Sequence, residues 1–123
     1  MPGRVIRLEP GVRVEAERRL EPGDACLNEK GHLPSVLTVE LMAQVGGLLI
    51  DDTNGGPGDY AVLAGVKRMH IHDAARSGET VEVSCRLARQ LGDLHLIECR
   101  ARAGDRELAH GSIQIRRMRR VPS

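Results

Sequence analysis

The stretch VLTVELMAQVGGLLI, residues 36–50, is an apolar run that contains one charged residue, Glu40. Its apolar positions surround the whole circumference of a helix, a pattern typical of a helix that is enclosed on every side. Ser35 follows Pro34 and is a credible N-cap, so we predict a helix from residue 35 to about residue 50. A carboxylate inside such a helix loses its hydration, and it must therefore be paired, neutralised or used chemically.

Two polar side chains share one face of this predicted helix. Glu40 and Gln44 are four residues apart, and Gly47 follows on the same face. A carboxylate, an amide and a glycine in this order are suited to line a slot into which another molecule comes close. The alternative interpretation is that Glu40 forms an ion pair with an arginine at a helix end or a dimer interface.

The segments on either side of the helix read as β-strands. Residues 3–24 contain two short runs around the turn signal Pro10-Gly11, and four longer runs follow at 60–72, 79–90, 94–103 and 107–116. The first of these four begins apolar on both faces, as a central strand does, and residues 51–57 read as a loop. One helix and a set of antiparallel strands predict an α+β fold, with the sheet wrapped around the helix in a single domain, residues 1–123.

Composition excludes several classes of function. The chain has 18 basic and 17 acidic residues and one aromatic residue, Tyr60, which does not favour a nucleic-acid partner. The three cysteines lack metal-binding spacing, the N-terminus lacks a leader pattern, and the run 36–50 is too short to span a bilayer. We expect a reduced, cytoplasmic protein with no membrane partner, no cofactor and no metal ion.

Several histidines and cysteines are candidates for catalysis or metal binding. His32, in the loop before the helix, is either an acid/base group or an ordinary loop histidine. His70 and His72 share one strand face and form a possible metal pair, but no third ligand has a telling spacing, so solvated strand residues are the favoured interpretation. Cys85 and Cys99 are among the inward-facing residues of their predicted strands and are interpreted as core residues. The role of Cys26, in irregular chain, stays open.

Three stretches resemble one known family. RVIRLEPGVRVEA (4–16) is similar to an opening strand with a Pro-Gly turn, and AGVKRMHIHDAARSGETVEV (64–83) to a long strand and the turn after it. PSVLTVELMAQVGGLL (34–49) resembles the helix motif Pro-Gly-Val-Leu-x-x-Glu-Ala-x-Ala-Gln, with matches at Pro34, Val36, Leu37, Glu40, Ala43 and Gln44. The family is that of the hotdog-fold FabZ/FabA-like 3-hydroxyacyl-ACP dehydratases, of which this chain looks like a divergent member.

The resemblance implies a function for Glu40. In these (3R)-hydroxyacyl-ACP lyases of fatty-acid or polyketide type metabolism, the glutamate acts with a histidine of the partner subunit. Both lie beside a tunnel for an acyl chain on its pantetheine arm, and no cofactor takes part. The resemblance thus implies a homodimer, or a higher oligomer of dimers, that binds acyl thioesters of ACP or CoA. Substrate would be bound by Gln44, Ser35, Val36 and Gly47.

The position of the histidine departs from the family motif. Without gaps, the family histidine falls on Cys26; with a shortened loop, Gly31-His32-Leu33-Pro34 corresponds to the family's Gly-His-Phe-Pro. Histidine accepts and donates protons near neutral pH, whereas a thiol in apolar surroundings is a poor acid for a hydroxyl leaving group. We therefore predict Glu40 and His32 as catalytic residues, with Cys26 as the alternative. A thioesterase and a non-catalytic acyl-binding or scaffold protein remain the alternative functions.

Overall fold

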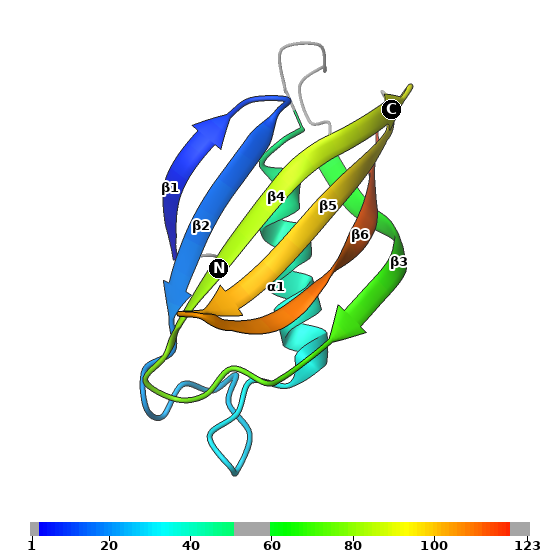
Figure 1. The fold of residues 1–123 in the computed structure, drawn as a ribbon. Helices are drawn as coiled ribbons and strands as arrows, with labels where there is room; N and C mark the ends of the chain where they lie inside the picture. The colour runs from blue at the N-terminus through cyan, green and yellow to red at the C-terminus, as the bar shows by residue number, and fades with distance from the viewer. Residues whose placement is uncertain (1–2, 51–59, 119–123) are drawn as a thin grey trace, which may run out of the picture.

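The fold is α+β, with one helix held against one antiparallel sheet (Figure 1). The computed structural model describes residues 3–50 and 60–118, so the predicted loop at 51–57 lies outside the described residues. The elements in chain order are β1 (Arg4–Glu9), β2 (Arg13–Arg19), α1 (Ser35–Gly47), β3 (Tyr60–Ile71), β4 (Thr80–Leu91), β5 (Leu94–Ala103) and β6 (Arg106–Met118). The curved sheet partly wraps the helix, which is the predicted hotdog arrangement.

The six strands are ordered β1-β2-β4-β5-β6-β3, so β1 and β3 form the two edges of the sheet. The prediction that residues 60–72 begin as a central strand is wrong, because β3 pairs with β6 alone among the described strands. Its apolar side chains are left open to solvent at Tyr60, Val62, Leu63, Val66 and Ile71. An edge strand that is apolar on both faces is usually covered by another part of the protein or by another chain.

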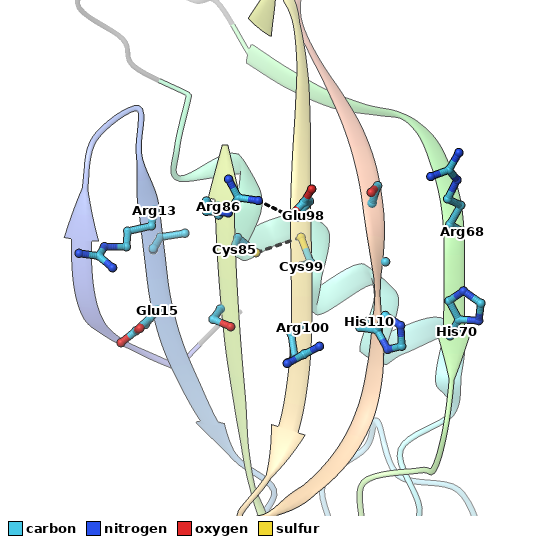
Figure 2. Close-up of a pocket in the computed structure, with 14 residues that line it drawn as sticks. Arg13, Glu15, Arg68, His70, Cys85, Arg86, Glu98, Cys99, Arg100 and His110 are labelled. Carbon is cyan, nitrogen blue, oxygen red and sulfur yellow. Dashed lines mark hydrogen bonds and ion pairs between the residues drawn. The ribbon is translucent and has the colours of Figure 1, made fainter. Parts of the chain in front are cut away.

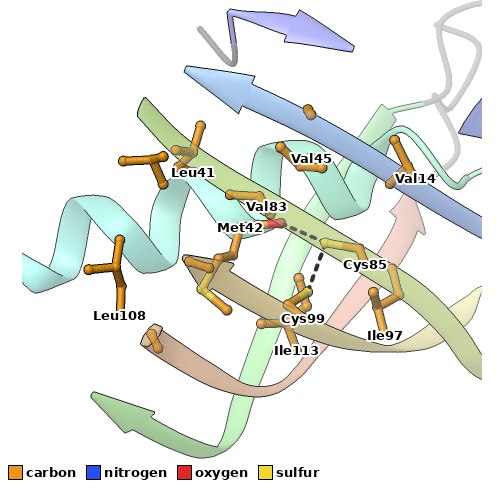
Figure 3. Packing of buried hydrophobic residues seen from close by; sticks show 14 of the residues in the cluster. Val14, Leu41, Met42, Val45, Val83, Cys85, Ile97, Cys99, Leu108 and Ile113 are labelled. Atoms are coloured by element: carbon orange, nitrogen blue, oxygen red, sulfur yellow. Dashed lines mark hydrogen bonds between the residues drawn. The ribbon is translucent and has the colours of Figure 1, made fainter. Parts of the chain in front are cut away.

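The core lies between the helix and the concave face of the sheet (Figure 3). The helix buries Thr38, Leu41, Met42, Val45 and Gly46. Gly46 lets the helix pack closely on the sheet, since a Cβ atom there would lie 3.1 Å from Cδ1 of Ile113. A larger residue would require the Ile113 side chain to shift.

Cys85 and Cys99 are core residues, as predicted. They lie opposite each other on β4 and β5, and their Sγ atoms are 3.1 Å apart (Figure 3). The hydrogen bond to Cys99, together with burial, raises the pKa of the Cys85 thiol well above its usual range. This thiol therefore stays protonated and behaves as a small apolar side chain.

The helix differs from its prediction in three respects, the first of which is that it ends at Gly47 rather than near residue 50. Its N-cap is Pro34 rather than Ser35: Pro34 has extended backbone angles, φ −54° and ψ 142°, and its carbonyl accepts the first helical hydrogen bonds, from Leu37 and Thr38. The expected enclosure on every side is also wrong for the single chain, because one sheet covers only one side of a helix. Val36 is 72% exposed, and Glu40 is exposed one turn further along.

A cluster of charges joins the start of β6 to the segment that precedes β4. Arg106 donates to both carboxylate oxygens of Glu79 at 2.7 Å, and its Nε lies 2.7 Å from Oδ2 of Asp73. The hydrogen bond from Arg106 is the main reason why the pKa of Glu79 is lowered, and the backbone amide of Ala74 is the main reason why that of Asp73 is lowered. We call these three residues the Arg106 cluster.

The Arg106 cluster fixes the loop that leads into the helix. The segment between Asp73 and Glu79 is bonded to this loop through Leu33 N to Ala75 O and Ser77 N to Gly31 O, both at 2.8 Å. His32 lies between these two contacts and forms an isolated β-bridge with Arg76. The position of His32 therefore depends on the Arg106 cluster.

Candidate active site

Glu40 lies on the side of α1 that faces away from the sheet core. Gln44, one turn later, is also exposed, and both residues line two neighbouring depressions in the surface. The structure thus brings together the predicted carboxylate and amide. It places them at an open surface of the chain rather than inside it.

The larger depression lies between the helix and the edge strand β3. This β3 groove has a volume of about 360 Å³, and its walls are formed by Ala43, Gly47, Ala61, Val62, Leu63 and Ile115. A Cβ atom at Gly47 would meet nothing within 4 Å, so the absence of a side chain there widens the groove rather than relieving a clash. The groove offers apolar walls of small and branched residues with Glu40 and Gln44 at one side, a combination that is common in small-molecule sites.

The smaller depression extends from Glu40 toward the loop before the helix. This Cys26 pocket has a volume of about 60 Å³ and is lined by Arg18, Cys26, Leu33, Leu37, Glu40, Leu41 and Gln44. Within one chain, therefore, the structure brings Cys26 to the pocket of Glu40. His32 is half-buried on the same loop, but it is outside the set of described residues that line this pocket.

Arg18 is a residue of this pocket that the sequence analysis missed. Its Nη2 donates to Sγ of Cys26 at 3.6 Å, a distance that is ordinary for sulfur. A signal for it was present in the alternation of β2, because Arg18 has the same parity as the buried residues Val14 and Ala16. An arginine that continues an inward-facing series is a candidate for a role in a site.

The first turn of α1 is the remaining predicted part of the site. Ser35 is half-buried and Val36 is exposed, and their amides precede the first helical hydrogen bonds, which Leu37 and Thr38 donate. Amides in this position carry the positive end of the helix dipole and suit a carbonyl oxygen or an anion. The groups that could share a metal ion lie elsewhere in the described chain, at His72, Glu107 and His110.

Comparison with known proteins identifies the family of this chain. Over 119 residues the chain is 28% identical to the 3-hydroxyacyl-[acyl-carrier-protein] dehydratase FabZ of Natranaerobius thermophilus, and the match covers 92% of this chain and 82% of that protein. The class is therefore that of the FabZ-like hotdog proteins. The model of the ApeP-like family, described as ApeP dehydratase, matches residues 5–121, and the chain belongs to this family.

Solved structures support the same fold at low sequence identity. The dehydratase heterocomplex ApeI:P from Xenorhabdus doucetiae matches with a TM-score of 0.79 and 18% identity, over 95% of this chain and 82% of that one. A hypothetical thioesterase with coenzyme A from Streptococcus pneumoniae matches with a TM-score of 0.77 and 11% identity, over 96% and 90% of the two chains. In the described part of this chain, no helix has the length and apolarity needed to cross a bilayer.

Proposed function

We propose that this chain dehydrates 3-hydroxyacyl thioesters carried on the phosphopantetheine arm of ACP or CoA. The observation that carries the proposal is the position of Glu40, which matches the helix motif of the dehydratases and lies where the β3 groove and the Cys26 pocket meet. Membership of the ApeP-like family supports the same reaction. We take residues 1–123 as one hotdog domain, and three free cysteines suit a cytoplasmic location.

The proposed reaction needs one base and one acid. The base removes the proton from C2, the electrons of that C–H bond form the C2–C3 double bond, and the C3–O bond breaks. The hydroxyl group takes a proton from the acid and leaves as water, so that the product is an enoyl thioester. We assign this pair of proton transfers to Glu40 and His32, with the amides of Ser35 and Val36 polarising the thioester carbonyl.

The β3 groove gives the acyl chain a place beside these groups. Its apolar walls suit methylene groups, and Gln44 and Gly47 border it next to Glu40. A volume of about 360 Å³ is within the usual range for small-molecule sites. The groove is open on the side away from the sheet, where a second chain would close it.

A thioesterase is the second candidate function. It is favoured by the pocket that Glu40 shares with Cys26 and Arg18 within one chain, because a carboxylate without a histidine is suited to activate water against a thioester. A thioesterase with coenzyme A also shares the fold. Hydrolysis breaks the C–S bond and releases a free thiol, whereas dehydration leaves the thioester intact.

One assay on the wild-type protein separates the two functions. We would supply 3-hydroxyacyl thioesters of CoA and of ACP and follow enoyl thioester formation by absorbance and free thiol with a thiol reagent. The enoyl product, and the reverse hydration of an enoyl thioester, are expected without thiol release. Thiol release without either of these reactions would replace the dehydratase by the thioesterase, and inactivity in all three measurements would leave the non-catalytic acyl-binding protein.

We further propose that the chain forms a homodimer. The helix exposes Val36, and Leu48 is exposed directly after its last residue. The neighbouring edge strand exposes Val62, Leu63 and Val66, so apolar surface lies on both sides of the β3 groove. A second copy that covers this surface would close the groove and hide the strand edge. Light scattering at micromolar concentration is expected to give twice the mass of the chain.

Two variants test whether the edge strand β3 forms the dimer interface. Val66→Lys adds a charge to the exposed edge strand and should shift the protein toward monomer, whereas Val12→Lys, at an exposed position in the β1–β2 turn, should leave the mass unchanged. A monomer in the wild type would contradict the homodimer. Dimer formation only after mixing with a second hotdog chain would point instead to a heterocomplex, as in the ApeI:P structure.

A further inference from the structure

The outer face of the sheet, opposite the helix, carries a group of side chains that the proposed reaction does not use. Figure 2 shows His70 on β3 and His110 on β6 projecting from this face, near Arg100. The chain continues along β6 beyond the end of β3, because the amide of His72 donates to the carbonyl of Leu108 at 2.8 Å. This contact brings His72 alongside His110.

Three of these side chains converge on one point. Nε2 of His72 lies 2.9 Å from Nδ1 of His110, and Nδ1 of His110 lies 3.3 Å from Oε1 of Glu107. Oε2 of Glu107 is 4.0 Å from Nε2 of His72, and the potential ligand atoms all lie within 4.8 Å of one another. We call His72, Glu107 and His110 the His–Glu cluster.

We propose that the His–Glu cluster binds a divalent transition-metal ion such as Zn²⁺. Zinc binds imidazole nitrogen and carboxylate oxygen at about 2.0–2.2 Å, so two ligand atoms of one ion lie about 3–3.5 Å apart. The two imidazole nitrogens, 2.9 Å apart, are close to this spacing. The two carboxylate oxygens of Glu107 lie 3.3 Å from one nitrogen and 4.0 Å from the other, so a rotation of the carboxylate brings one oxygen within range of both. Three protein ligands leave a further position for water, which the exposure of the cluster allows.

The neighbouring residues hold the three ligands in place. Arg100 forms an ion pair with Glu107, with Nε 2.9 Å from Oε1, and this pair restrains the carboxylate. His110 is packed between two rings, with centroid distances of 4.9 Å to both His70 and His72. Hydrogen-bonded carboxylates and restrained imidazoles are the usual surroundings of metal ligands.

The alternative is that the cluster is held together without a metal. In that case a proton is shared between His72 and His110, and Glu107 serves only as the partner of Arg100. The positive charge of Arg100 also opposes a cation. The two interpretations differ in one measurable property, which is whether the folded chain takes up a divalent ion at these three residues.

Metal titration of the untagged, chelator-treated protein tests the proposal. Zn²⁺ binding would be followed by calorimetry, and Co²⁺ binding by its visible absorption, which reports the ligands directly. We expect one ion per chain, and at least about a tenfold loss of affinity in His72→Ala and in His110→Ala, because even the loss of an outer partner typically costs that much. His70→Gln is the comparison variant, because it removes a ring that packs on His110 but no ligand, so it should lose less affinity than His72→Ala.

Each outcome decides the proposal. The absence of binding in the wild type would overturn it, and so would unchanged affinity in both His72→Ala and His110→Ala. A loss in His70→Gln as large as that in His72→Ala would overturn the assignment of the ligands. Glu107→Gln tests the third ligand, but it also removes the ion pair with Arg100. If circular dichroism shows that this variant is misfolded, the result for His72→Ala decides, because the side chain of His72 is exposed at a strand end.

Discussion

Glu40→Gln is expected to reduce the dehydration rate by about 10²–10⁴-fold, the usual contribution of a general acid or base. The amide has nearly the same shape as the carboxylate but can neither take up nor release the proton that moves during the reaction. Because Glu40 is exposed on the outward face of α1 in the chain, its replacement should leave the melting temperature unchanged within about 3 °C. The measurement is kcat/KM for hydration of an enoyl thioester, the reverse reaction.

The matched control for this variant is Glu82→Gln. Glu82 is an exposed carboxylate on β4, outside both depressions around Glu40, so its replacement changes the net charge equally without touching the site. Activity of this control should equal that of the wild type. An active Glu40→Gln protein would mean that Glu40 is not catalytic and that the ion-pair interpretation of this residue takes precedence.

His32→Ala is expected to lose activity on the same scale, about 10²–10⁴-fold, while Cys26→Ser keeps most of it. The physical reason is that imidazole exchanges protons readily near neutral pH, as reversible dehydration demands. The loop contacts on either side of His32 are made by backbone atoms of Gly31 and Leu33, so the alanine variant keeps them. Equal circular dichroism spectra would show that this loss is chemical.

The opposite result has a clear structural interpretation. If Cys26→Ser is inactive and His32→Ala is active, the ungapped alignment applies, and the pocket shared by Cys26, Arg18 and Glu40 is the reacting site.

Mixing inactive Glu40→Gln and His32→Ala chains tests whether one site takes residues from both subunits. If each site takes Glu40 from one subunit and His32 from the other, mixed dimers contain one intact site and regain activity; if both come from one chain, they stay inactive.

The strands and the helix were predictable because their signals are local. In β4 the inward residues Val81, Val83 and Cys85 alternate with outward ones, and no other information is needed to place them. The helix began at residue 35 as predicted, and its regular part ended at Gly47, three residues earlier than expected. The position of Glu40 on the helix followed from its spacing to Gln44.

The features that sequence could not supply depend on distant parts of the chain. The exposure of Glu40 depends on which side of the helix the sheet covers, which no helical periodicity can show when both sides are apolar. The His–Glu cluster needs the register that sets His70 opposite His110, so the His70–His72 pattern alone gave no third ligand. The role of Arg18 depends on the path of the loop that brings Cys26 to its guanidinium group.

The Arg106 cluster determines how a pH–rate profile of this protein would be interpreted. A carboxylate whose pKa is lowered by folding contributes its full stabilisation at pH values above its unfolded pKa. That contribution is lost progressively as the pH falls from the unfolded pKa through the lowered, folded pKa. Asp73 and Glu79 both have lowered pKa values, so the attachment that holds the loop of His32 stays charged from about pH 5 upward. A change of rate between about pH 5 and 8 would therefore report the reacting groups themselves rather than detachment of the loop that carries one of them.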